Sequence, residues 1–569
     1  MSSTAETGMA TRGVRATVGV LLVLLLALMG PVVYQLVMGS VTSVSLDGAI
    51  SFTAHYYADL LGDGDSLRAA LNTVLFAVGS TLVATVVGGF QAWVAERTNA
   101  PLRRLAYAGA LTLIGMPYLV YVIAWVLVLG RGGLVNSALA ALTGSDNPAI
   151  FDVNSLVGMV FIEGFVWSPM AFLLIAASLK QANPAFEEAA RMSGAGIGVM
   201  VRRITIPLAW PAVLAVGLLT LIRSMEAFEV PAIVGLPGNV QVVTTQVYTA
   251  IQQEMPPDYG RASAVSVGLM VVVGLLLWWN GTLTRRAERY QVVTGSHYRP
   301  AALNLGRWRY PAAAGSALVF LVVVAVPLAM LVWVSVVPVY QGVDGSLFHF
   351  TLRNFTAAVH TPSLAEGTVN TLLLCLGAAV VSCLAASLVA WFVVRRATAS
   401  RLLDQLMSLP LVVPGIVVGL AVSQVGLTSP VPLYGTVWVL ALGYLITFLP
   451  FAMRYAYTGA IQIQAALEES ARVAGARYPA VFRRIVLPLL MPAMVTGGLF
   501  VFMQGVRALS MPVFLASPQH PVAAVSLYEL WSNGSTTTVA AFGVLWTAAM
   551  VLVAGVLSAL ARRSRVSLF

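Results

Sequence analysis

The sequence contains little charge and few of the residue types that enzymes use. Only 9% of its 569 residues are Asp, Glu, Lys or Arg, and there are two cysteines and five scattered histidines. The single lysine, Lys180, follows Leu179 rather than a glycine, so no phosphate-binding loop of the form G-x-x-x-x-G-K-[ST] can be present. No H-E-x-x-H or C-x-x-C pattern occurs either. These absences argue against an ATPase, a metalloprotease and a zinc protein.

The two cysteines offer little scope for a disulfide. Cys375 and Cys383 lie eight residues apart (383 minus 375) in one apolar run. In a helix that spacing corresponds to a rise of about 12 Å, which is too far for a disulfide bond. We therefore expect both to be packing residues, and we expect no cofactor or metal to be resident in this chain.

Apolar residues dominate the chain instead. They make up 59% of it, and the mean hydropathy is +0.87. Hydrophobic runs of about 20 residues are typical of helices that cross a lipid bilayer. The sequence therefore predicts an all-α, polytopic membrane protein in contact with membrane lipid. The twelve expected spans are residues 14–38, 69–94, 105–129, 156–179, 208–224, 263–283, 310–335, 367–394, 403–425, 433–457, 489–506 and 538–560.

Arginine supplies the net charge of +10, and its distribution argues against nucleic-acid binding. Most arginines gather between alternate spans, as do the six within residues 285–309. This pattern follows the positive-inside rule, so we expect cytoplasmic N- and C-termini and a location in the plasma (bacterial inner) membrane. The first span follows Arg12 and Arg15 as a signal peptide would. Its length and the lack of a clear cleavage site favour a retained anchor.

One polar segment occurs twice, each time after the fourth hydrophobic run of its half. Residues 187–211 read EEAARMSGAGIGVMVRRITIPLAWP, and residues 468–492 read EESARVAGARYPAVFRRIVLPLLMP. The offset is 281 residues throughout (468 minus 187). An acidic start, a glycine, a basic pair and a proline that opens the next span predict a helix-turn-helix on the membrane face. An interfacial amphipathic helix with snorkelling arginines is the simpler alternative, but it would not require the glycine and proline to repeat.

These two segments resemble the EAA motif of ABC importer permeases, in which Glu-Ala-Ala is followed by Gly and then by Ile-x-Leu-Pro. Both copies depart slightly from it, at Ile206 and Ser470, where the motif has Leu and Ala. In that family the segment forms a coupling helix that sits in a cleft of the cytoplasmic ATPase subunit. The resemblance assigns this coupling role to Glu187, Glu188, Ala189, Ala190, Gly194, Ala195, Ile204, Pro207, Glu468, Glu469, Ala471, Gly475, Ala476, Ile485 and Pro488.

The resemblance covers nearly the whole chain and is closest to fused permeases of the ferric iron, thiamine and polyamine group. It implies the fold of a type I ABC importer permease, built from two parallel six-helix repeats. It also implies two copies of a cytoplasmic ABC ATPase subunit, which would bind ATP and Mg²⁺, and an extracytoplasmic solute-binding protein. The chain itself is expected not to be an enzyme.

A second register supports an internal duplication. Asn72-Thr73 and Ala92-Trp93 match Asn370-Thr371 and Ala390-Trp391 at an offset of 298 residues (370 minus 72). The first half therefore carries 17 additional residues (298 minus 281), which we expect in the outer loop 131–155. The expected organisation is a first half 1–284 with its EAA segment at 187–207, a cytoplasmic linker 285–309, and a second half 310–569 with its EAA segment at 468–488.

Several charged residues fall within a span or at the outer end of one. Ionisable groups at such depth are costly unless they pair or face a water-filled path. They are therefore candidates either for a substrate pathway or gate, or for structural partners such as a span-end arginine. At the 281-residue offset Glu226 meets Arg507 and Glu229 meets Ser510, so the two halves have diverged here. The candidates are Glu163, Arg223, Glu226, Glu229 and Arg507.

Among the solutes of the resembling group we favour ferric iron, because these carboxylates would suit a hard cation. Thiamine, a polyamine and a phosphonate are the alternatives within the same importer class. A proton- or sodium-coupled secondary transporter with two parallel repeats is the rival from another class. The doubled EAA segment favours the importer, since an ion-driven carrier has no ATPase for it to contact.

Overall fold

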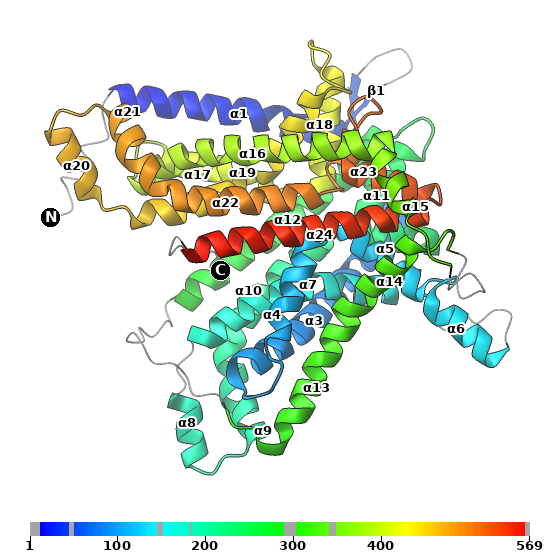
Figure 1. The fold of residues 1–569 in the computed structure, drawn as a ribbon. Helices are drawn as coiled ribbons and strands as arrows, with labels where there is room; N and C mark the ends of the chain where they lie inside the picture. Colours follow the sequence, from blue (N-terminus) through cyan, green and yellow to red (C-terminus); the bar gives the residue numbers. More distant parts are fainter. Residues whose placement is uncertain are drawn as a thin grey trace.

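A computed structural model describes residues 12–44, 50–144, 152–181, 185–288, 303–340 and 349–563. Its helices form two arms that meet at one end and diverge towards the other (Figure 1). One arm ends in α20 (Ala465–Val473) and α21 (Tyr478–Val481), and the other ends in α8 (Ala185–Met192) and α9 (Ile197–Met200). The two EAA segments therefore lie at the separated tips of the arms.

The number of spans agrees with the sequence prediction. Within the described residues, eleven helices are long and apolar enough to cross a membrane, or twelve if one bent pair forms a single span. The chain is thus a multi-pass, all-α membrane protein. The elements that contribute to these spans are α1 (Arg12–Val41), α3 (Gly64–Arg97), α5 (Tyr118–Leu129), α7 (Leu156–Gln181), α10 (Ile206–Met225), α12 (Tyr259–Glu288), α13 (Arg309–Phe320) with α14 (Val326–Val336), α16 (Pro362–Val394), α17 (Ser400–Ser408) with α18 (Gly415–Thr428), α19 (Val437–Gln462), α22 (Leu487–Arg507) and α24 (Thr536–Arg563).

The third span of each half is broken, whereas the sequence predicts continuous helices over 105–129 and 403–425. In the first half α4 (Leu105–Gly115) stops before Pro117, and in the second half α17 and a short 3₁₀ turn stop before Pro414. The residues that precede these prolines are extended, with ψ values of 132° at Met116 and 110° at Val413. A proline ring disfavours the helical conformation of the residue before it, which explains both breaks. The second break turns the chain by 105°.

Small residues bring the central helices of each half close together. A Cβ atom at Gly88 in α3 would lie only 2.6 Å from the backbone nitrogen of Phe172 in α7. In the second half a Cβ atom at Gly505 in α22 would lie 2.8 Å from Sγ of Cys375 in α16. Small residues are the usual basis of close helix packing in membranes. Cys375 and Cys383 are free and buried, which confirms that they are packing residues.

The first helix of each half packs against the other half. The Ser316 hydroxyl in α13 donates to Oε1 of Gln91 at 2.6 Å, and the Tyr121 hydroxyl donates to the Val323 carbonyl at 2.8 Å. In the opposite direction, Nε2 of Gln35 in α1 donates to Oγ1 of Thr428 at 2.6 Å. The two halves therefore interlock rather than lie side by side.

The predicted linker 285–309 is described only at its two ends. Helix α12 continues to Glu288, and residues 289–302 lie outside the described part of the chain. Where the description resumes, the Leu303 N–H bonds to the Arg97 carbonyl at 2.8 Å and its carbonyl accepts from the Asn99 N–H at 3.1 Å. The start of the second half is thereby fixed to the end of α3 beside the EAA segment, and we call the helix ends on this side inner and those on the opposite side outer.

The outer ends of the halves contain shorter elements that the sequence reading did not predict. Two of them, α11 (Val243–Gln252) and α23 (Ala523–Ser532), occupy equivalent positions after the fifth spans. Residues 130–155 join α5 to α7 and include α6 (Leu134–Thr143), whereas residues 429–436 alone join α18 to α19, as the expected insertion requires. The remaining outer elements are β1 (Thr42–Val44), β2 (Ile50–Phe52), α2 (His55–Gly62) and α15 (Arg353–His360).

The repeated Asn-Thr pair has a structural role that explains its recurrence. Thr73 Oγ1 accepts the Val243 N–H at 2.9 Å, and Thr371 Oγ1 accepts the Ala523 N–H at 3.0 Å. The adjacent amides of Asn72 and Asn370 donate to the carbonyls of Gln241 and Pro521. Each pair thus holds the loop that leads into α11 or α23.

A hydrogen-bonded turn ties the outer ends of two first-half helices together. The Asp63 carboxylate caps α3 by accepting the N–H groups of Asp65 and Ser66, and it also accepts from the Arg261 guanidinium at 3.1 Å near the start of α12. The hydrogen bond from the Ser66 hydroxyl is the main cause of a lowered pKa at Asp63.

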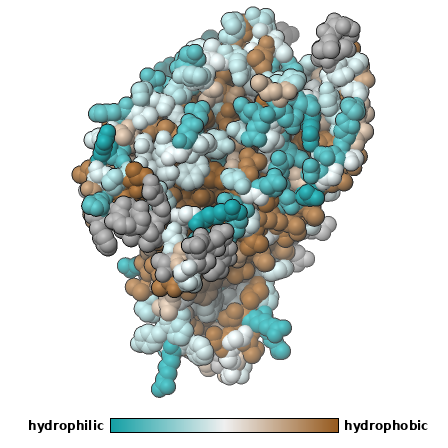
Figure 2. Space-filling view, turned by 90° about the vertical axis from the view of Figure 1, so that its right-hand side faces the viewer, coloured by the Kyte–Doolittle hydropathy of each residue, from teal (hydrophilic) through white to brown (hydrophobic). Residues whose placement is uncertain are grey.

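Figure 2 shows hydrophilic side chains over the upper part of one side of the molecule and an apolar zone below them, as expected at a membrane boundary.

Candidate coupling segments and pathway

Each EAA segment forms the predicted helix-turn-helix. Helices α8 and α9 are separated by Gly194, and α20 and α21 by Gly475, with φ angles of +78° and +88°. Beyond each glycine an N–H group bonds back to a helix carbonyl at 2.9 Å, from Ala195 to Ala190 and from Ala476 to Ala471. This left-handed glycine closes a helix C-terminus in a way that other residues rarely can. The repeated glycine is therefore required by the backbone.

The first glutamate of each segment points inward and anchors it. Glu468 is buried and accepts two hydrogen bonds from the Arg395 guanidinium, at 2.7 and 3.0 Å, at the inner end of α16. Glu187 is likewise buried, and its Oε2 lies 3.4 Å from Nη1 of Arg97 at the inner end of α3. Arg97 and Arg395 are equivalent residues at the 298-residue offset. The sequence reading assigned these glutamates to coupling but did not identify their arginine partners.

A third partner differs between the halves. Glu187 accepts a hydrogen bond from the Thr205 hydroxyl at 2.7 Å, but the residue equivalent to Thr205 is Val486, which has no donor. In the second half Nε1 of Trp391 donates to Glu468 at 2.9 Å instead. The equivalent Trp93 has a buried Nε1 that finds no hydrogen-bond partner in the described part of the chain. The halves therefore satisfy the same buried carboxylate by different donors.

The outer surface of each segment is exposed and partly apolar. Met192 and Val473, at equivalent positions, are each 91% exposed, and the equivalent Phe186 and Leu467 are 57% and 48% exposed. Of the other predicted residues, Ala189 and Glu469 are exposed, while Glu188, Ala190, Ala195, Ile204, Ala471, Ala476 and Ile485 are partly buried. An exposed apolar patch of this kind, repeated at both arm tips, is typical of a protein interaction site.

A π-helical turn joins each segment to the fifth span. These turns are η1 (Val201–Thr205) and η8 (Phe482–Val486), at equivalent positions. In each, the last N–H before the proline reaches back five residues, from Ile206 to Val201 and from Leu487 to Phe482. Pro207 and Pro488 follow directly, lack an N–H and would crowd the preceding turn of a regular helix. The wider π turn accommodates that ring.

Glu163 is held by side chains that the sequence reading did not identify. It is fully buried in α7, where it accepts a hydrogen bond from the Tyr118 hydroxyl and one from Nε1 of Trp167 at 2.8 Å. The sequence suggests a span-end arginine as its structural partner. That suggestion is wrong, because the groups that donate to the carboxylate are a tyrosine and a tryptophan. Two uncharged donors thus satisfy this buried acid.

The other candidates lie where α10 and α22 end. Arg223 donates to Glu226 at 2.9 Å and lies over the ring of Phe451 in the second half, 5.4 Å from its centre. The carboxylate of Glu229 accepts the backbone N–H of Phe228 at 3.4 Å and lies near Leu509 and Ser510 of the other half. Arg507 lies close enough to Tyr118 and Glu229 to interact with them electrostatically. The structure therefore brings Glu163, Glu229 and Arg507 together around Tyr118.

Aromatic rings close the space between the halves beyond these charges. Tyr248 on α11 lies 6.2 Å from Phe514 and 6.3 Å from Tyr528 on α23, measured between ring centres. We call Tyr248, Phe514 and Tyr528 the outer closure. Because the arms diverge at the coupling end and meet here, the structure is closed on the side away from the coupling segments.

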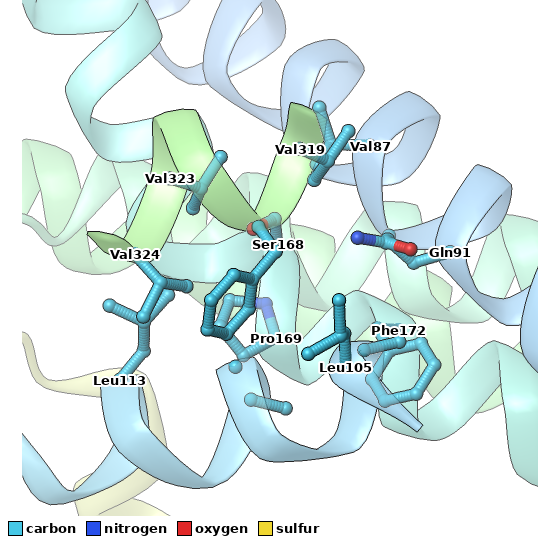
Figure 3. A pocket seen from close by; sticks show the side chains of 15 residues that line it. Val87, Gln91, Leu105, Leu113, Ser168, Pro169, Phe172, Val319, Val323 and Val324 are labelled. Atoms are coloured by element: carbon cyan, nitrogen blue, oxygen red, sulfur yellow. The ribbon is translucent and has the colours of Figure 1, made fainter. Parts of the chain in front are cut away.

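A small cavity of about 30 Å³ lies beside α3, α4 and α7 of the first half and is also lined by Val323 and Val324 of the second. Figure 3 shows its side chains, which are apolar apart from Gln91 and Ser168. The amide of Gln91 is already bonded to Ser316, and the Ser168 hydroxyl donates to the Phe165 carbonyl at 2.8 Å. The cavity therefore lacks the free polar groups that a solute site requires.

Comparison with known proteins identifies the family. Residues 67–289 and 378–566 each match the model of the binding-protein-dependent transport system inner membrane component. The chain is 30% identical over 442 residues to a probable ABC transporter permease protein, y4fN, of Sinorhizobium fredii, covering 75% of each protein. It is 26% identical over 558 residues to the ferric transport system permease protein FbpB of Actinobacillus pleuropneumoniae, covering 95% of this chain and 78% of that one.

Another relative has a different solute in its name. A putative 2-aminoethylphosphonate transport system permease protein, PhnU, of Salmonella typhi is 25% identical over 224 residues, which cover 39% of this chain and 76% of that protein. With two matched domains and two anchored EAA segments, the chain belongs to the family of binding-protein-dependent transport system inner membrane components, and it is the permease, not the ATPase, of an ABC importer.

Proposed function

We propose that this permease carries ferric iron across the bacterial inner membrane. Iron would come from an extracytoplasmic solute-binding protein, and two cytoplasmic ATPase subunits that hold ATP and Mg²⁺ would drive transport. A relative that matches 95% of the chain is named as a ferric transport system permease, which supports iron. The phosphonate permease matches only 39% of the chain, and it makes a phosphonate the second candidate.

The paired coupling segments carry the mechanistic part of the proposal. Each is anchored by a buried glutamate to the inner end of a central helix, at Arg97 or at Arg395, and each exposes apolar side chains. Two ATPase subunits that approach one another on ATP binding would draw the arm tips together. Because the arms are continuous with the outer closure, that movement would separate Tyr248 from Phe514 and open the path outward.

In this proposal the solute-binding protein, and not this chain, selects ferric iron over other solutes. Within the described residues, no group of three or more His, Cys, Asp or Glu side chains is arranged to hold a metal ion. The carboxylates that favoured iron in the sequence reading have protein partners instead. Iron is therefore the transported substrate in this proposal and not a ligand resident in the permease.

Competition uptake tests the proposal in a host from which this chain has been deleted. Cells complemented with the wild-type chain should take up radiolabelled ferric iron, and excess unlabelled iron should compete, while thiamine, spermidine and 2-aminoethylphosphonate should not. The matched control is the Gly475→Asp variant, which should insert but not transport. Uptake of the phosphonate without uptake of iron would replace iron as the substrate and leave the importer assignment intact.

A further inference from the structure

Arg507 is a half-buried cation that forms no hydrogen bond or ion pair with the described residues. It ends α22, its Nε atom is buried without a hydrogen bond, and no described carboxylate oxygen lies within 4.0 Å of its guanidinium. A buried donor is costly when it has no acceptor. Arg395, which is also half-buried, is hydrogen-bonded to Glu468, whereas Arg507 keeps its buried Nε donor open for a ligand.

The acids near Arg507 are all engaged elsewhere. The charge of Glu229 acts on Arg507, but its carboxylate lies more than 4.0 Å from the guanidinium, and one of its oxygens accepts the Phe228 N–H at 3.4 Å. Glu226 forms an ion pair with Arg223, and Glu163 accepts hydrogen bonds from Tyr118 and Trp167. Among the pathway candidates, Arg507 thus keeps a donor without an acceptor, whereas each of the three carboxylates accepts at least one hydrogen bond. An anion could bind at Arg507 without displacing any of these bonds.

The position of Arg507 places it directly inside the outer closure. Helix α22 runs from the coupling segment towards the outer side, and Phe514 of the closure follows Arg507 by seven residues (514 minus 507). Only one half offers such a cation, because the equivalent residue in the first half is Glu226. A solute that entered when Tyr248 and Phe514 separated would therefore meet the end of α22, where Arg507 lies.

We propose that Arg507 is the receptor for an anionic oxygen group on the transported solute. A guanidinium offers paired N–H donors that match a carboxylate, phosphate or phosphonate, so such a group would bind Arg507 and satisfy its open Nε donor. The solute class is therefore a small oxyanion, or a ferric ion that remains wrapped in carboxylate or phosphate ligands, and not a bare metal ion or an organic cation. This inference rests on the proposed importer function and narrows its substrate.

Saturation-transfer NMR on the full-length chain in lipid nanodiscs tests the inference directly. The probes are methylphosphonate, citrate, citrate with Ga³⁺ as a diamagnetic substitute for ferric iron, and spermidine as an organic cation. Wild type should bind at least one of the three anionic probes and not spermidine. Arg507→Met should weaken that binding by about tenfold, because a hydrogen bond to a charged group is lost together with the charge.

Two further variants provide the controls. Arg353→Met removes an exposed arginine at the outer end of the same half and should leave the affinity unchanged. Arg507→Lys keeps the charge but loses the planar pair of donors, so its affinity should lie between those of wild type and Arg507→Met. It also carries the test if Arg507→Met does not fold. Binding of citrate only with Ga³⁺ would identify the metal chelate as the solute, whereas binding of methylphosphonate alone would identify a free oxyanion.

Other results would overturn the inference. Spermidine binding by wild type that strengthens in Arg507→Met would show a cation path, and an unchanged anion affinity in both Arg507 variants would remove the residue from solute binding. No anion binding by wild type would do the same. The importer proposal fails separately, through solute uptake into proteoliposomes that contain this chain without any ATPase.

Discussion

A buried glutamate fixes each coupling segment, and its removal has a predictable cost. Replacing Glu468 by Ala would leave Arg395 largely buried without its carboxylate, because that side chain is only 17% exposed. Breaking a buried ion pair in this way typically costs about 3 kcal/mol. We therefore expect α20 to lose protection in hydrogen exchange and ATPase coupling to fall. Glu469→Ala, at the exposed neighbouring position, is the control, and equal effects of the two changes would argue against the anchoring role.

The glycine of each segment is required for its backbone conformation rather than for its small size, and substitutions can test this. A Cβ atom at Gly475 would meet no atom of the described residues within 4 Å, so the obstacle that these residues present is the φ angle of +88°. We expect Gly475→Ala to cost about 1 kcal/mol and Gly475→Asn less, because asparagine tolerates the left-handed region better.

Transport-coupled ATP hydrolysis by the reconstituted importer measures the effect, with Gly194→Ala and Gly194→Asn as the matched pair. If Asn proves as harmful as Ala at both sites, close approach of the partner ATPase is the better explanation of the glycine. Gly194→Asp and Gly475→Asp should abolish transport without loss of membrane insertion, since they also place a charge on the docking surface.

The join between coupling segment and fifth span depends on a proline and a π turn. Pro207→Ala or Pro488→Ala restores the missing N–H and removes the ring that requires the wider turn. We expect the turn to relax to a regular helix, which would rotate the segment by about 100° relative to the span. Spin-label distances between the two arm tips should change, whereas Pro211→Ala, one turn into α10, should leave them unchanged. If the distances do not change in the Pro207 and Pro488 variants, the proline is not the cause of the π turn.

The sequence predicts the elements better than their irregularities. Hydrophobic length identifies the spans, and two gap-free repeats identify the coupling segments. The third spans are nevertheless broken at Pro117 and Pro414, although both prolines are visible in the sequence, because an apolar run alone does not distinguish one helix from two. The short helices α11 and α23 are too short to stand out, and their anchors, Thr73 and Thr371, lie far away in sequence.

The candidate site shows the same limit. The sequence locates the charged residues of the site but does not show which groups bond to them. The partners of Glu163 and Glu229 include an uncharged tyrosine and a backbone N–H group. Such donors carry no charge signal in a sequence. An unsatisfied arginine can be recognised only after every neighbouring acid has been assigned to its own partner, which requires coordinates.

At the scale of the whole molecule, the interlocked halves imply that the outer closure and the arm tips move as one system. The closure joins Tyr248 of the first half to Phe514 of the second across 6.2 Å between ring centres. A short bifunctional thiol reagent should therefore link cysteines introduced at these two positions, after the buried Cys375 and Cys383 have been replaced by serine or alanine. The linked protein could not open outward, so solute uptake should stop and reducing the link should restore it.

The matched control carries both cysteines of a pair within one half, at Tyr248 and Phe228, whose rings lie 5.2 Å apart. Linking these should leave the halves free to separate, and uptake should persist. ATP hydrolysis provides a second readout, because a closure that cannot open should hold the arm tips apart and suppress stimulation of the ATPase by the loaded binding protein. Full uptake through the fully linked Tyr248–Phe514 pair would show that the solute crosses elsewhere, and it would remove Arg507 from the path as well.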